Sequence, residues 1–103
     1  MKQDVYDFFS RELGLGADEI GPLYETFVDS FSEVAGELRG TQPTDEAGLR
    51  RITHAIIGFS QNVGALDLFE AAKTLNAAAK AGDAAACQAG MARILALYDD
   101  YAK

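Results

Sequence analysis

The sequence is short of the residues that build disulfides and most metal sites. Its 103 residues include one cysteine and one histidine. A single cysteine excludes an internal disulfide and a thiolate metal cluster, and a single histidine excludes a His–His metal pair. A Ser-His-Asp site stays open only if it uses that one histidine, His54. The length predicts one domain, spanning residues 1–103.

Basic charge is also scarce, with 9 Lys and Arg against 16 Asp and Glu and a net charge of −7. Nucleic acids and anionic membranes need a basic surface, so neither is expected as a partner. No apolar run approaches about 18 residues, which argues against a membrane span. Asp4 and Asp7 lie where an export signal would be basic and then apolar. Together with the free Cys87, this predicts a cytoplasmic protein, and the start at Met1 suggests a free-standing one.

Only two prolines occur, and no stretch shows the period-two alternation of β-branched residues that is typical of strands. Ala, Leu, Glu, Lys and Arg, all good helix formers, fill the second half of the chain. A short helix is expected in residues 1–14. A cleaner helix follows, in which Pro22 falls near the start, where a missing backbone donor costs little. Its apolar seam is Ile20, Tyr24, Phe27, Phe31, Val34 and Leu38.

Three more helices complete the predicted fold. The first of them has Thr44 or Asp45 as a candidate cap and Gly64 just past its end. Its apolar seam is Leu49, Ile52, Ile56, Phe59 and Val63. The next runs through about 65–81, and the last from about 84 to the C-terminus. Because short turns make consecutive helices antiparallel, we predict an all-α fold: an up-down antiparallel four-helix bundle over residues 17–102 with an additional short N-terminal helix.

His54 is predicted to point away from this core. At about 100° per residue, His54 lies roughly 160–200° from Ile52 and Ile56 on the same helix. Arg50 lies about 40° to one side of His54 and Arg51 about 60° to the other. On geometry alone, an outward histidine on a helix is most simply a surface residue.

Three further residues share the direction of His54: Ile57, Gly58 and Gln61. Ile57 is a branched apolar residue predicted to lie outside the bundle. Gly58 is a glycine inside a helix, which costs about 1 kcal/mol relative to alanine. A glycine one turn past an exposed histidine leaves room for a close approach, and an exposed isoleucine beside it favours a protein surface as the approaching object.

The segment from His54 to Leu68 resembles the signature of histidine phosphotransfer (HPt) domains, which reads roughly His-x-Leu-Lys-Gly-x-Ser-x-x-x-Gly-Ala-x-x-Leu. The positions in register are His54, Gly58, Ser60, Gly64, Ala65 and Leu68. The resemblance covers residues 17–102 and implies a four-helix bundle that carries a phosphoryl group on His54 between aspartates of response-regulator receiver domains. Hybrid histidine kinases would be further partners.

The resemblance assigns His54 as the phosphoacceptor and Gly58 as the small residue that leaves room beside it. No intrinsic cofactor is expected, and Mg²⁺ is expected only in the partner receiver domain. The chain is expected to be a monomer. Ile57 stands where the family usually has a lysine that assists the phosphoryl group, and Arg50 and Arg51 could supply positive charge instead. The predicted docking surface has Ile57 and Gly58 at its centre and Arg50, Arg51 and Gln61 at its rim.

Two other functions stay open. The absence of the family lysine favours a non-catalytic helical adaptor that binds a receiver domain or kinase without being phosphorylated. An unrelated enzyme with His54 as general base is a weaker alternative, since no nucleophile or orienting acid can be placed beside His54.

Overall fold

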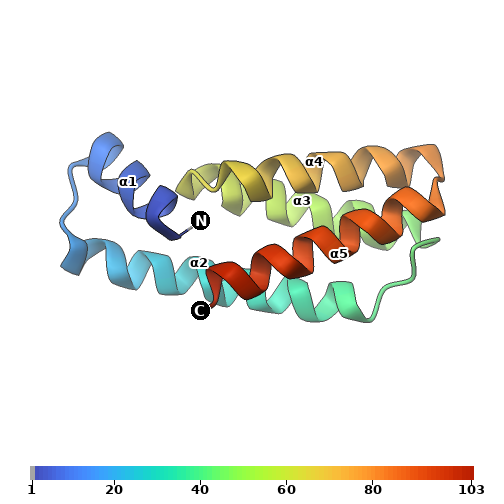
Figure 1. The fold of residues 1–103 in the computed structure, drawn as a ribbon, viewed down its shortest axis with the longest axis horizontal. Helices are drawn as coiled ribbons and strands as arrows, with labels where there is room; N and C mark the ends of the chain where they lie inside the picture. Colours follow the sequence, from blue (N-terminus) through green and yellow to red (C-terminus); the bar gives the residue numbers. More distant parts are fainter. Residues whose placement is uncertain (1) are drawn as a thin grey trace.

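The described residues, 2–103, form five helices and no strand in a computed structural model. The helices are α1 (Lys2–Leu13), α2 (Ala17–Arg39), α3 (Glu46–Val63), α4 (Leu66–Ala81) and α5 (Ala84–Tyr101). Helices α2 to α5 run along the long axis of the molecule, and α1 lies across one end (Figure 1). The molecule measures 43 × 20 × 18 Å. This confirms the predicted all-α fold, and the helices pack against one another in a way that is consistent with a bundle.

The predicted apolar seams form one core. Every seam residue of α2 is buried, as are Leu49, Ile52, Ile56 and Val63 of α3. Phe59 is the exception, because it is only partly buried at the edge of the core. Its ring nevertheless packs against Phe27 and Phe31 of α2, with centroids 5.9 and 6.0 Å away.

The most extensive helix pairing joins α3 to α4, followed by α4 to α5. Small residues make the close approach possible, because Ala72 and Ala79 are buried in the seam of α4. Gly90 of α5 faces Leu75 so closely that an added Cβ would lie 3.1 Å from its Cδ1 atom. The alanine-rich helices α4 and α5 are therefore a tightly packed pair.

Two tyrosines tie the C-terminal end of α5 to the rest of the bundle. The hydroxyl of Tyr24 in α2 donates to the carbonyl oxygen of Tyr101 at 2.5 Å, and the Tyr101 hydroxyl donates to Asp67 Oδ1 of α4. Burial, with a smaller contribution from Tyr6, raises the pKa of Tyr24 to about 12. Burial and the bond to Asp67 also raise the pKa of Tyr101.

The sequence predicts Pro22 near the start of α2, where a missing backbone donor costs little. The helix starts at Ala17, so Pro22 lies inside it, beyond the first turn. Pro22 cannot donate the hydrogen bond that this position would otherwise make, so its cost is larger than the sequence reading assumed. The Pro22 carbonyl oxygen still accepts a bond, at 3.1 Å, from the Thr26 hydroxyl.

None of the helices in residues 2–103 combines the length and the apolar character needed to cross a membrane.

Candidate functional site

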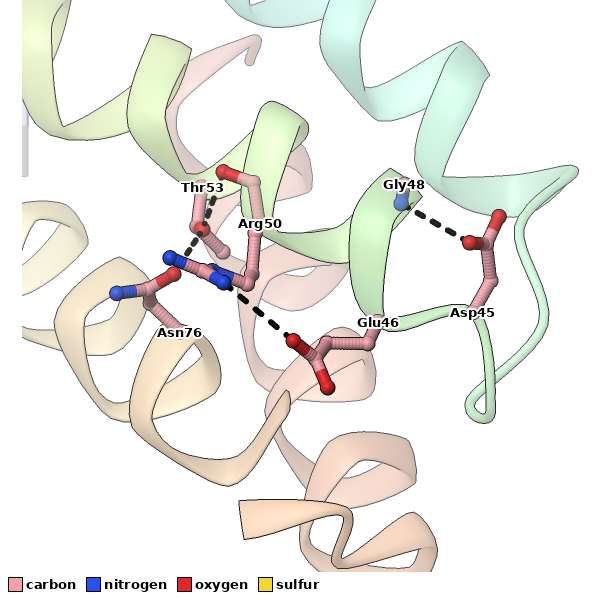
Figure 2. Close-up of polar contacts among 6 residues, drawn as sticks. All are labelled: Asp45, Glu46, Gly48, Arg50, Thr53 and Asn76. Atoms are coloured by element: carbon pink, nitrogen blue, oxygen red, sulfur yellow. Dashed lines mark hydrogen bonds and ion pairs between the residues drawn. The ribbon is translucent and has the colours of Figure 1, made fainter. Parts of the chain in front are cut away.

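Helix α3 is fixed at both ends by the residues that the sequence suggested. Asp45 caps its start, since the Asp45 carboxylate accepts a bond from the Gly48 backbone N–H at 3.0 Å (Figure 2). Gly64 ends it in the left-handed conformation, at φ 71°. Thr44, the other candidate, contributes only its backbone carbonyl oxygen, which accepts a bond from the Glu46 N–H at 3.1 Å. With both ends fixed and its apolar seam buried, α3 presents its opposite face to the outside in a defined rotation.

His54 lies on that outer face. Its side chain is exposed, whereas Ile52 and Ile56 on the same helix are fully buried. Within residues 2–103, His54 makes no hydrogen bond or ion pair. The imidazole is therefore open to a partner on the side that the helical spacing predicted.

Gly58, one turn further along α3, is exposed and has open space around it. A Cβ added there would meet no atom within 4 Å outside its own helix turn, and the backbone is ordinary α-helix. Gly64 is different, because its φ is positive and an added Cβ would lie 2.5 Å from the ring of Phe8. The fold thus explains the glycine at Gly64 but gives no reason for the one at Gly58, which costs about 1 kcal/mol relative to alanine.

Ile57 is more buried than predicted. It is half-buried and packs against the edge of the core, rather than projecting outside the bundle. Its direction explains this, since Thr53 on the same flank of α3 bonds to Asn76 of α4 and this flank therefore faces α4. Ile57 consequently supports the bundle while leaving part of its side chain on the surface.

Arg50 lies on the flank of α3 toward α4, one turn before His54. Its Nη1 atom is 3.4 Å from Glu46 Oε2, a long contact at a surface where 44% of the Arg50 side chain is exposed (Figure 2). Its Nε atom, however, is buried and has no hydrogen-bond partner within the described part of the chain. A buried donor without an acceptor costs about 1–3 kcal/mol.

Arg51 and Gln61 extend the same outer face in different directions. Arg51 reaches toward α2, where its Nη1 atom lies 3.3 Å from Glu37 Oε1, and 64% of its side chain is exposed. Gln61 is exposed and lines a hollow of about 510 Å³ between the end of α3 and α1. All six predicted site residues thus lie on one helix. Four of them are exposed, and a fifth, Arg50, has an exposed end.

Sequence reasoning missed two fully buried polar side chains, Thr53 and Ser60. The Thr53 hydroxyl lies within bonding distance of the Arg50 carbonyl oxygen, at 3.0 Å, and of Asn76 Oδ1, at 3.2 Å (Figure 2). The Ser60 hydroxyl donates to the Ile57 carbonyl oxygen at 3.3 Å. The position of Thr53 around the helix axis could have predicted its burial. Thr53 falls between the apolar seam and the outer face of α3, where a neighbouring helix must lie.

The described residues hold no group of three or more His, Cys, Asp or Glu side chains arranged to bind a metal ion. Cys87 is buried, and burial together with Asp83 raises the pKa of its thiol, which disfavours the reactive thiolate. His54 does not line any of five hollows found on the surface of residues 2–103. The arrangement offers an imidazole on a convex helix face, with arginines on both flanks.

Comparisons with known proteins give no match: no family model fits the chain, and neither the curated proteins nor the solved structures include one that is significantly similar to it. Any functional assignment therefore depends on the chemistry of the outer face of α3.

Proposed function

We propose that the protein is a phosphorelay carrier that accepts a phosphoryl group on His54 and passes it on. Donor and acceptor would be aspartates of response-regulator receiver domains in two-component signalling, with a hybrid histidine kinase as a further source. The observation that carries the proposal is the pairing of exposed His54 with Gly58, a helical glycine that nothing in the fold requires. The resemblance of this segment to the HPt signature supports the same reading.

The chemistry needs one exposed imidazole and a well-aligned phosphoryl donor. The unprotonated ring nitrogen of neutral His54 attacks phosphorus, and the bond between phosphorus and the aspartate oxygen breaks. The aspartate leaves as a carboxylate, and the new phosphoimidazolium keeps its proton on the other ring nitrogen. Alignment and charge neutralisation dominate such transfers, so the receiver's acidic site, with its Mg²⁺, would supply most of the catalysis.

The proposal includes the finer architecture. In it, α2 to α5 form an up-down antiparallel four-helix bundle and α1 is an additional helix packed against α2 and α3. A monomer in the cytoplasm completes the proposal, because a carrier must meet successive receivers. Docking would centre on Ile57 and Gly58, with Arg50, Arg51 and Gln61 around them.

The test is transfer from phosphorylated receiver domains in the presence of Mg²⁺. We expect an acid-labile, base-stable label on the wild-type chain and none on His54→Gln. Because His54 is the only histidine in the chain, phosphohistidine identifies the site without mapping. Thermal melting of His54→Gln should match the wild type, since the side chain is exposed. Undiminished labelling of His54→Gln would refute the proposal.

Ile57 favours a second candidate, a helical adaptor that binds a receiver domain without being phosphorylated. An apolar residue at this place supports docking but offers no charge to a phosphoryl group. The adaptor predicts receiver binding that His54→Ala leaves unchanged, and no phosphohistidine with any receiver. The carrier predicts that Ile57→Lys accelerates transfer from the receiver, a gain that the adaptor does not allow.

A further inference from the structure

We propose that Arg50 is the residue that binds the phosphoryl group on His54, and that it does so by leaving Glu46. This inference rests on the proposed function and deepens it, because it names the cation that replaces the missing lysine. Two arginines precede His54 in the sequence, and their side chains have different surroundings in the structure. The ligand in question is a phosphoryl dianion with three acceptor oxygens.

The first argument is the bonding of the Arg50 side chain. Its Nε–H is buried without an acceptor among residues 2–103, and its only ion pair is the 3.4 Å contact with exposed Glu46. A guanidinium group presents five donors in a planar fork, so this arrangement uses little of its capacity. An acceptor with several oxygens on the same face would satisfy more of these donors than Glu46 does.

The second argument is position. Arg50 precedes His54 by one helical turn, so the two side chains are neighbours on the outer surface of α3. Next to Arg50 is Thr53, whose hydroxyl lies within hydrogen-bonding distance of both the Arg50 carbonyl oxygen and Asn76 Oδ1 of α4 (Figure 2). The base of the Arg50 side chain is therefore fixed, while its exposed end can turn from Glu46, one turn before it, to His54, one turn after it.

Arg51 provides the contrast. It lies on the other flank of α3 and pairs with Glu37 of α2 at 3.3 Å. Its side chain is 64% exposed, so water can satisfy its donors, and movement toward His54 would remove a contact that links two helices. Arg51 and Arg50 carry the same charge at similar distances along the chain, so Arg51 is a matched control.

The experiment loads the phosphoryl group chemically, without a protein partner. Phosphoramidate transfers its phosphoryl group to the neutral imidazole: the new nitrogen–phosphorus bond forms as the old one breaks, and ammonia leaves. The ³¹P resonance of the loaded chain is then followed against pH. A nearby cation lowers the pH at which phosphohistidine loses its proton. Arg50→Gln should raise this midpoint by about one pH unit, whereas Arg51→Gln should raise it by much less.

Two further measurements sharpen the result. The ¹⁵N–¹H signal of Arg50 Nε should shift on phosphorylation, as expected when a donor gains an acceptor. Glu46→Gln removes the competing carboxylate and should lower the ³¹P midpoint, while Arg50→Lys, which keeps the charge without the fork, should fall between wild type and Arg50→Gln. Melting curves establish that all variants are folded.

The inference would be overturned if Arg50→Gln and Arg51→Gln had equal ³¹P midpoints. It would also be overturned if the ¹⁵N–¹H signal of Arg50 Nε did not change on phosphorylation. The carrier function fails by a different result. If no receiver transfers to His54 while the ³¹P midpoint still depends on Arg50, the contact is real and the carrier proposal is wrong. If receivers transfer normally but the two midpoints coincide, the carrier stands and the Arg50 inference is wrong.

Discussion

The two sides of the bundle differ in whether their polar side chains have hydrogen-bond partners within the protein. On the side of α2 and α5, Tyr24 and Tyr101 each donate to a defined acceptor, and the Tyr101 hydroxyl links α5 to Asp67 of α4. On the outer face of α3, His54 has no partner within residues 2–103 and Arg50 Nε is buried without an acceptor. Paired groups hold helices together, whereas groups left unpaired are available to a second molecule.

The comparison predicts where substitutions will affect stability and where they will affect only recognition. Phe31 on the first side is fully buried and contacts the rings of Phe27, Phe59, Tyr98 and Tyr101. Phe31→Ala should lower the free energy of unfolding by about 3–5 kcal/mol, because it leaves a cavity in this cluster. Chemical denaturation measures the loss, with His54→Ala as the control expected to stay within about 0.5 kcal/mol of wild type.

Breaking the tyrosine contact without creating a cavity should have a smaller effect. Tyr101→Phe removes the bond to Asp67 and should cost about 1.5–3 kcal/mol at neutral pH, since the acceptor is a carboxylate. An unchanged midpoint of urea denaturation would show that this contact contributes nothing to stability.

The same tyrosines predict a loss of stability in alkali. The pKa of Tyr24 rises from 10.0 to about 12 on folding, so the folded state holds the proton more tightly. This contribution is complete below pH 10 and is lost as the pH rises from about 10 to 12. The free energy of unfolding should therefore fall across this range. The slope should be shallower in Tyr24→Phe, and equal slopes in the two proteins would contradict the prediction.

Much of this division could be read from the sequence, because helical spacing decides which residues face the core. The seam of α2, the Asp45 cap, the Gly64 end and the outward direction of His54 all follow from period and capping chemistry. The burial of Ile57 and the contact of Thr53 with Asn76 could not be read in this way. They depend on which flank of α3 the next helix covers, and one helix seen alone carries no information about its neighbour. The buried Nε atom of Arg50 has the same origin.

Ile57 lies on the boundary between the two sides, so its replacement should affect both properties. Ile57→Glu should lower the free energy of unfolding by about 1 kcal/mol, less than a fully buried isoleucine would, because the side chain is half-buried. It should also weaken binding to the receiver that transfers to His54, measured by calorimetry. A loss of stability with unchanged binding would place Ile57 wholly in the core and outside the docking surface.

Gly58 provides the finest test, because stability and recognition should change in opposite directions there. An added Cβ meets no atom within 4 Å outside its own turn of helix, so Gly58→Ala should raise the free energy of unfolding by about 0.5–1 kcal/mol through helix propensity alone. The same methyl group would occupy the space beside His54 and should slow transfer from a receiver.

Gly36, on the exposed surface of α2, also has no atom within 4 Å of an added Cβ. Gly36→Ala is therefore the matched control, with a similar gain in stability and no change in transfer. If Gly58→Ala transfers as fast as Gly36→Ala, the open backbone at Gly58 is not part of the docking surface.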